Sequence, residues 1–192
     1  MKKNTISYLL LSCFLAAGSV SALQQPTDTS NEAAPSRDVT GSRPMLSVTE
    51  AEIPPQIDGR LTDSIWENAT VYTDFRTFEP DIGSPSSEPT CAYAAYDREN
   101  LYFAFRCTDS QPRAIKASMT KRDNIFGEDL VAVFLDTYHD SQSAYVFMAN
   151  PYGIQADLMM NSDGNGNPQS ADFIWESKGT LTENGYTVEM KI

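Results

Sequence analysis

The segment EDLVAVFLDTYHDSQSAYVFMANPYGIQADLMM, residues 128–160, decides the fold. It contains three apolar or alternating stretches, at residues 130–135, 144–149 and 154–160. Each has about the length of a β-strand. Polar, turn-forming residues separate them, as YHDSQS and NPYG. Short strands joined by such turns predict neighbouring antiparallel strands in one sheet.

The same pattern extends to both sides of this segment. Further strand-like runs lie at residues 71–78, 90–96, 101–107, 114–119 and 186–192. Turn signals such as DREN and TENG separate them. This spacing predicts an all-β fold, an antiparallel, jelly-roll-like β-sandwich.

One short helix is expected near the start of the domain, in TDSIWENA (62–69). Thr62 can cap it, and Ile65, Trp66 and Ala69 share one face. A large aromatic residue at helical spacing usually packs in the core, so we assign Trp66 to the core.

The first 22 residues have the pattern of a secretory signal peptide. Lys2 and Lys3 precede an apolar run, residues 6–17, and Val20-Ser21-Ala22 fits a cleavage site. The alternative is a lipoprotein signal cut before Cys13. We therefore expect an exported protein that is periplasmic, secreted or associated with the outer membrane.

Composition divides the rest of the chain into a linker and one folded domain. Residues 23–45 are rich in Pro, Ser, Thr and acid and lack aromatic residues, which predicts a disordered linker. The folded domain is expected at residues 46–192. Its last strand is still alternating when the sequence stops at Ile192, so we expect a fragment of a longer protein.

The charge balance narrows the classes of partner. With 14 basic and 26 acidic residues the net charge is −12, which disfavours nucleic acid. It disfavours an anionic membrane surface equally. Membrane contact would then come only from a missing C-terminal region or from a lipid anchor.

Two cysteines lie in adjacent predicted strands, and the strand register decides whether they can pair. If Tyr96 pairs with Leu101, Cys91 lies opposite Arg106 and the two thiols point to opposite faces. A shift of one residue would instead bring Cys91 and Cys107 within disulfide reach. Both alternatives are open at this point, a disulfide or two buried thiols.

Several segments together resemble one known family. They are IDGRLTDSIWENA (57–69), AYDRENLYFAFRCTDS (95–110), the block from Arg122 to Asp157, DFIWES (172–177) and NGYTVEMKI (184–192). The chain resembles family 9 carbohydrate-binding modules, and more closely the amino-terminal domain of larger exported bacterial proteins. The resemblance implies non-catalytic binding of an oligo- or polysaccharide in carbohydrate catabolism.

The resemblance to family 9 modules implies a binding site in which two aromatic side chains clamp a terminal sugar. Phe126 takes the position of one clamp residue, while the second position falls beyond Ile192. The acidic residue of the family's following strand is replaced here by Ala132. These departures put the clamp in doubt.

Other residues are candidates for sugar contact on their own chemistry. Sugar recognition uses flat aromatic faces and a few polar groups. The ligand-binding candidates are Phe126, Trp175, Tyr152, Arg122 and Asp129. For Trp175 the alternative is core packing, and for the charged pair it is a solvated rim of ion pairs.

The loop NSDGNGNPQSAD (161–172) has the spacing of oxygen ligands in a calcium loop. Its metal-ligand candidates are Asn161, Asp163, Asn165, Asn167 and Asp172. Asn replaces Asp at the first position and Asp replaces the usual final Glu. The alternative is an ordinary Gly- and Asn-rich connection without a metal, so calcium is a candidate cofactor of this loop.

The sequence offers no catalytic motif. No Ser or Cys nucleophile pattern occurs, and the single histidine, His139, lies in a polar turn. Hydrolase activity would therefore belong to an attached domain. Two other functions stay open: a structural or assembly domain of an outer-membrane protein, and a haem-binding sandwich using His139 with Met148, Met159 or Met160.

Overall fold

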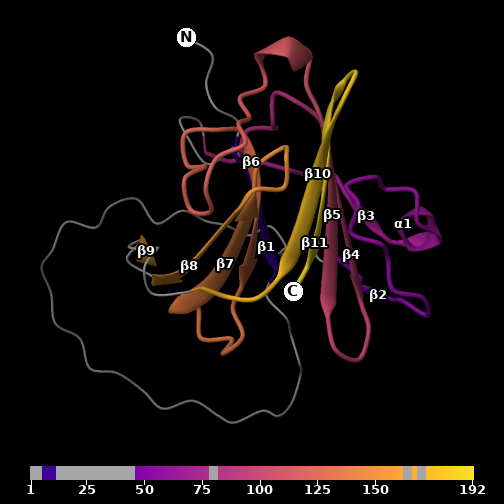
Figure 1. Ribbon diagram of the computed structural model, residues 1–192. Coiled ribbons are helices and arrows are strands. Elements are labelled where there is room, and N and C mark those ends of the chain that lie inside the picture. The colour runs from indigo at the N-terminus through magenta and orange to yellow at the C-terminus, as the bar shows by residue number, and fades with distance from the viewer. Residues whose placement is uncertain (1–5, 12–45, 78–81, 162–165, 168–171) are drawn as a thin grey trace, which may run out of the picture. The chain divides into compact units, whose positions relative to one another are not determined.

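The computed structural model describes residues 6–11, 46–77, 82–161, 166–167 and 172–192. Its strands form two sheets (Figure 1). Sheet A has the order β1-β6-β7-β8-β9, with bounds β1 (Ile6–Leu11), β6 (Leu130–Leu135), β7 (Ser143–Ala149), β8 (Gln155–Asn161) and β9 (Gly166–Asn167). Sheet B has the order β10-β11-β5-β4-β2, with β3 also on β4. Its bounds are β10 (Glu176–Thr182), β11 (Gly185–Lys191), β5 (Leu101–Thr108), β4 (Thr90–Tyr96), β2 (Thr49–Glu50) and β3 (Val71–Tyr72).

The main core lies between the two sheets, which confirms the all-β sandwich. Sheet A contributes residues such as Val131 and Phe147, and sheet B contributes Phe103, Phe105 and Val188. All are at most 5% exposed. Burying a side chain of this size contributes about 1.5–3 kcal/mol, so this shared cluster holds the two sheets together.

Period-2 segments form strands close to their predicted bounds. The strands at residues 90–96 and 130–135 have the predicted limits. Those at 101–108, 143–149, 155–161 and 185–191 differ by about one residue at an end. Alternation works here because each strand is buried on at least one face.

Two strand predictions were wrong in extent or in kind. Residues 114–119 are not a strand, because the backbone N–H groups of Lys116 and Ser118 bond to the side chains of Asp129 and Glu128, 2.7 and 3.2 Å away. A short 3₁₀ turn, Pro112–Ala114, precedes them. In the described part of the other segment, residues 71–77, only β3 is a strand.

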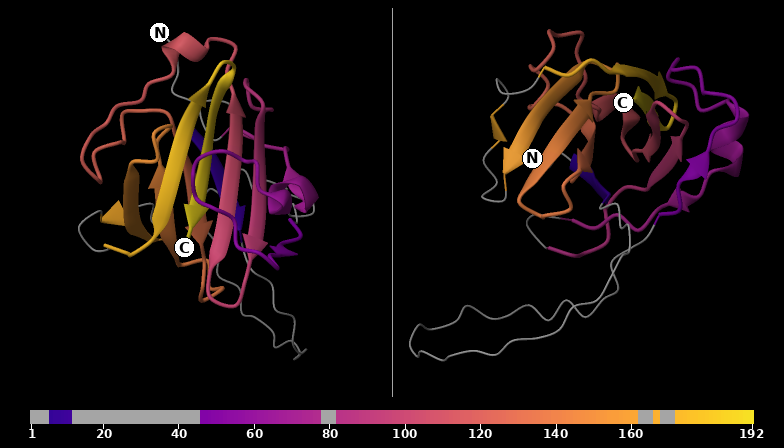
Figure 2. Two further views of the ribbon diagram at one scale, coloured as in Figure 1. Left: turned by 45° about the vertical axis from the view of Figure 1, so that its right-hand side comes forward. Right: turned by 90° about the horizontal axis from the view of Figure 1, so that it is seen from below.

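The predicted short helix is α1 (Ser64–Asn68), on the side of sheet B away from sheet A (Figures 1 and 2). Its N-cap is Asp63 rather than Thr62. Trp66 is 4% exposed and packs with Tyr93 and Tyr102, which confirms its assignment to a core. The helix thus covers the outer face of sheet B.

A buried carboxylate anchors this cover to the sheet. Glu189 of β11 is fully buried and accepts hydrogen bonds from Trp66 Nε1 (2.7 Å) and from the backbone N–H groups of Gly59 (2.7 Å) and Asp58 (3.1 Å). Gly59 has a φ of +82°, and a Cβ there would lie 2.8 Å from Thr180 Oγ1. The IDGRLTDSIW motif therefore folds a close-fitting layer over β11.

The cysteine register excludes the disulfide in this structure. Tyr96 pairs with Leu101 and Cys91 with Arg106, so the two thiols point to opposite faces and both are free. Cys107 lies in the main core, where burial raises the pKa of its thiol to about 12. The candidate bridge from Cys91 to Cys107 is thus corrected to two separate buried or half-buried thiols.

Part of the predicted leader forms a strand, β1, which pairs in parallel with β6. The rest of the leader and the predicted linker lie outside the described residues, so their boundaries stay predictions. Within the described ranges, no helix has the length and apolarity needed to cross a bilayer.

Candidate functional site

The connection between β5 and β6 carries Phe126, the predicted clamp residue. Ile125 is fully buried in a small apolar cluster on the outer face of sheet A, with Leu130 and Met148 among its neighbours. The next residue, Phe126, is 48% exposed. One side chain of this pair thus fixes the loop, and the other presents an aromatic ring to solvent.

Two carboxylates brace this connection from within. Glu128 accepts hydrogen bonds from the backbone and hydroxyl of Ser118 and from Asn150 Nδ2, the last at 2.7 Å. Asp129 Oδ2 accepts the N–H of Lys116 at 2.7 Å, and the Asp129 N–H donates back to the Lys116 carbonyl at 3.0 Å. Asp129, a predicted ligand residue, therefore braces the loop that carries Phe126.

A buried amide joins this loop to the turn between β7 and β8. Asn150 is fully buried, and its Oδ1 accepts the N–H groups of Tyr152 (3.0 Å) and Ile154 (2.9 Å). Its Nδ2 donates to Glu128 and to the Ser118 carbonyl. Because one side chain serves both segments, the half-buried Tyr152 and the Phe126 loop belong to one connected rim.

The same turn is packed against β10 with no room for a side chain. A Cβ on Gly153 would lie 2.6 Å from Lys178 Cα, and a Cβ on Gly179 would lie 2.4 Å from the Pro151 carbonyl oxygen. Ser177 Oγ also donates to the Gly153 carbonyl at 2.8 Å. The turn therefore connects sheet A directly to sheet B.

Arg122, four residues before Phe126, belongs to a polar network around a buried carboxylate. Asp157 of β8 is fully buried, and its Oδ1 accepts Arg122 Nη2 and Trp175 Nε1, the latter at 3.2 Å. Its Oδ2 accepts the Phe173 N–H at 2.9 Å. Arg122 also donates to Gln155 Oε1 and to the Phe173 carbonyl, both at 2.8 Å.

This network moves Trp175 from the ligand-facing group to the core. Trp175 is 7% exposed and packs edge-on against Phe147, with ring centroids 5.4 Å apart. Its ring N–H is used by Asp157. Because the indole is buried, packs against Phe147 and uses its N–H internally, it has little surface to offer a sugar. Core packing is therefore the role that the structure shows.

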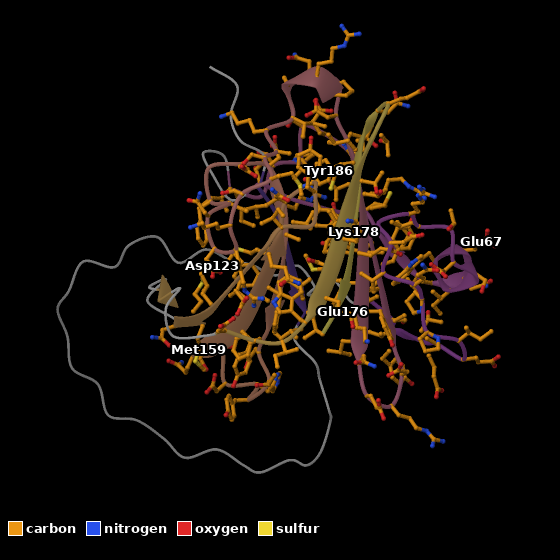
Figure 3. All side chains as sticks on the ribbon, in the orientation of Figure 1. Glu67, Asp123, Met159, Glu176, Lys178 and Tyr186 are labelled. Carbon is orange, nitrogen blue, oxygen red and sulfur yellow. The ribbon has the colours of Figure 1, made fainter. Side chains whose placement is uncertain are left out.

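Asp123 continues the support on the outer side of β8 (Figure 3). Its N–H donates to the Gln155 carbonyl at 2.9 Å, and its Oδ1 accepts the Asp157 N–H at 3.3 Å. It has a φ of +65°, a left-handed conformation that aspartate tolerates better than most residues. These bonds attach the loop to the edge of β8 three residues before Phe126.

The sequence analysis missed three residues whose hydrogen bonds hold the loop around Phe126: Asn150, Asp157 and Glu128. Asn150 precedes a turn proline and Asp157 occupies an ordinary polar position in an alternating strand. Only their contacts with residues distant in sequence distinguish them. A carboxylate flanked by apolar residues was the one available signal.

The predicted calcium loop lies mostly outside the described residues. Asp163 and Asn165 belong to that part, while Asn161 ends β8 and Asn167 lies in β9. The Asp172 carboxylate is 91% exposed and lies 3.5 Å from Arg122. Among the residues that can be described, no cluster of three or more His, Cys, Asp or Glu suits a metal.

The structure separates His139 from Met148, one of the three methionines considered as haem ligands. His139 is exposed in the turn between β6 and β7, with a φ of +54°. Met148 lies near the other end of β7 and is buried in the cluster around Ile125. At about 3.3 Å per residue, the strand separates these two candidate ligands by far more than one iron can bridge.

A hollow of about 340 Å³ lies elsewhere, at the turn between β4 and β5. It is lined by Glu50, Ala51, Glu52, Pro54, Asp97, Arg98 and Glu99. Hydrogen bonds from Tyr102 and the turn backbone lower the pKa of Asp97 to about 2. Asp97 thereby stabilises the turn, at the opposite end of β5 from the Phe126 loop.

Comparisons with known proteins point to one family. A family model described as carbohydrate family 9 binding domain-like matches residues 57–192. No curated protein matches the chain.

Solved structures share the fold. The chain is similar to a family 9 carbohydrate-binding module from Caldicellulosiruptor kristjanssonii in complex with glucose, at 20% identity and a TM-score of 0.54 over 76% of this chain and 66% of that one. The same figures hold for the module in complex with cellotriose, with 65% of that chain covered. A protein from Bacteroides uniformis whose proposed activity is carbohydrate binding matches at 12% identity, a TM-score of 0.58, and 77% and 71% coverage.

Proposed function

The chain belongs to the carbohydrate family 9 binding domain-like family, and we propose that it is a non-catalytic module that binds an oligo- or polysaccharide through the rim around Phe126. The observation that carries the proposal is the pairing of a fully buried Ile125 with a 48% exposed Phe126. An exposed ring on a braced loop supplies the flat apolar face that a pyranose ring stacks on.

The bracing matters because binding costs conformational entropy. A loop that must be ordered by its ligand loses affinity to that ordering. Here Glu128, Asp129 and Asn150 already fix the loop by hydrogen bonds to backbone groups of Lys116 and Ser118. The backbone around Phe126, which a 3.0 Å hydrogen bond from the Glu128 N–H to the Ile125 carbonyl closes into a turn, is thus ordered before any sugar arrives.

Tyr152 is a polar residue that the connected rim offers besides Phe126. Its backbone is held by Asn150, and its side chain is half-buried. A phenol has an apolar ring and a hydroxyl group that can bond a sugar hydroxyl. We assign Arg122, Asp129 and Trp175 to the support of this surface rather than to direct sugar contact.

We also propose that the module is exported and serves polysaccharide use. The leader pattern in residues 1–22 supports export. The similar module from C. kristjanssonii was solved with glucose and with cellotriose. Glucose and cello-oligosaccharides are therefore the first ligands to test, followed by xylo- and manno-oligosaccharides.

The test is titration calorimetry of the full chain against this sugar panel. We expect at least one sugar to bind, and Phe126→Ala to weaken that binding by about tenfold, which corresponds to the loss of one aromatic stacking contact. Phe126→Trp should retain it. Tyr138→Ala is the matched control, because Tyr138 is also an exposed aromatic residue, 68% exposed, but lies in another loop.

Either of two results would overturn the proposal. One is a folded chain that binds no member of the panel. The other is binding that Tyr138→Ala weakens as much as Phe126→Ala does, because the ring of Phe126 would then have no particular role.

Calcium in residues 161–172 is a separate proposal that rests on the spacing of oxygen ligands. Calcium that binds only the native state should raise the thermal midpoint, and a chelator should reverse the rise. Asp163→Asn should abolish this rise in the thermal midpoint. Asp140→Asn, which replaces an acidic residue in a different loop, should leave it intact. An unchanged midpoint in the parent chain would exclude a stabilising calcium ion.

A further inference from the structure

The ends of the two sheets differ in how well they are protected. An edge strand presents unpaired N–H and C=O groups, and proteins protect such edges with short strands or charged residues. The edge strands β2 and β9 have two residues each. The edge strand β10 carries the exposed charges Glu176 and Lys178. Three of the four sheet ends in the described part of the chain are thus short or charged.

Strand β6 has none of these protections. Its sequence LVAVFL contains no charge, proline or glycine. Val131, Ala132 and Val133 are each fully buried, so both faces of the strand are apolar and covered. Strands of this composition normally lie inside a sheet with a partner on each side.

The partner on the second side of β6 is β1. The pairing is parallel and runs through all six residues, from Ile6 opposite Leu130 to Leu11 opposite Leu135. A parallel pair needs a connection of a dozen or more residues, and residues 12–129, which lie between the two strands, supply ample length. This is the mode in which an extended segment adds to a sheet edge by backbone hydrogen bonds.

We propose that the β6 edge is a binding site for an added parallel strand, an uncharged extended apolar segment of about six residues, which Ile6–Leu11 fills in the full chain. Residues 6–11 fall within the segment predicted to be a cleavable leader. Once that segment is cleaved from the domain, no covalent link holds the two strands together. The edge then holds its strand by the ladder alone and exchanges it for a segment of the same chemistry.

The test uses the full chain with a specific protease site inserted within residues 23–45. After cleavage, size-exclusion chromatography should show the amino-terminal piece co-eluting with the domain. Excess synthetic peptide of residues 2–11, KKNTISYLLL, should then release it. Hydrogen exchange at Leu130–Leu135 should stay slow while either segment is bound.

Proline scanning supplies matched controls. Successive N–H groups of a strand point to opposite sides, so either Leu9→Pro or Leu10→Pro removes a donor that faces β6. One of these two peptides should compete about tenfold more weakly than the parent peptide. Asn4→Pro, which lies before the strand, should compete normally.

Two outcomes would overturn the proposal. The first is elution of the cleaved piece apart from the folded domain. The second is equal competition by the parent, Leu9→Pro and Leu10→Pro peptides, which would show that no strand ladder is formed. Because the competition is measured with peptides on the parent domain, it stays decisive even where a full-chain proline variant fails to fold.

Discussion

Asp157 and Glu189 are both fully buried carboxylates on strands, and each holds a non-strand segment in place. Asp157 is paired with a cation, Arg122, in addition to Trp175 and the Phe173 N–H. Glu189 is held by three uncharged N–H donors, those of Trp66, Gly59 and Asp58. One anchor lies next to the proposed sugar-binding rim and the other under the helix on sheet B.

The difference predicts different costs for neutralising the two groups. Removing one partner of a buried ion pair leaves the other charge without compensation. Removing the charge from a carboxylate bound only by neutral donors loses part of its hydrogen bonding, but also removes the cost of burying that charge. The anchor beneath the rim is therefore the more sensitive of the two.

The largest effect is expected for Asp157→Asn. Arg122, whose side chain is 34% exposed, would lose its buried counter-ion, and the unfolding free energy should fall by about 3 kcal/mol. Denaturant titration measures this. Asp172→Asn is the matched control, because Asp172 also faces Arg122 but is 91% exposed, and it should cost less than about 0.5 kcal/mol.

Glu189→Gln should cost less, about 1 kcal/mol. The amide retains one oxygen acceptor, so at least one of the three N–H donors keeps a partner. Trp66→Phe should give a similar loss, and combining the two changes should cost less than their sum because both remove the same bond. A loss for Glu189→Gln equal to that for Asp157→Asn would contradict the comparison.

Glu189 should also leave a mark on the pH dependence of stability. Burial raises the pKa of its carboxyl above the ordinary value of 4.5, against the opposing effect of its hydrogen bonds. Between 4.5 and the raised pKa the native state binds more protons than the unfolded state. Its contribution to stability is therefore present at low pH and declines as the pH rises through that window. The stability difference between parent and Glu189→Gln should follow this slope, and a pH-independent difference would refute it.

The smallest effect is expected at the proposed binding surface itself. Phe126 is 48% exposed, so Phe126→Ala should change the unfolding free energy by less than about 0.5 kcal/mol while weakening sugar binding. Thermal melts with and without sugar separate the two effects. A large loss of stability would mean that the ring packs as support rather than serving the ligand.

These residues also show what the sequence can predict. The strands at residues 90–96 and 130–135 follow from short apolar runs bounded by turn residues, because strands buried on both faces are apolar throughout. Strand β10 was missed, since among its seven residues only Gly179 is buried and no apolar face marks it. It exists because it pairs with β11 across a tight turn.

The site was predictable only in its exposed part. Phe126 was found through the family pattern, and its exposure agrees with a surface role. Glu189 lies in a strand where alternation assigns it to solvent, yet a layer 123 to 131 residues away in sequence covers it. Contacts over such separations leave no local pattern to detect.

The close contact between Gly153 and Gly179 has a consequence for how the module can change over time. Neither position has room for a methyl group, and each faces the backbone of the other's segment, so one cannot be relieved by altering the other's side chain. Random substitution would be purged at both sites, whereas the exposed ring next to Ile125 is free to vary. At the proposed binding rim a lineage built on this scaffold can therefore acquire new sugar preferences, while the contact between its two sheets stays fixed.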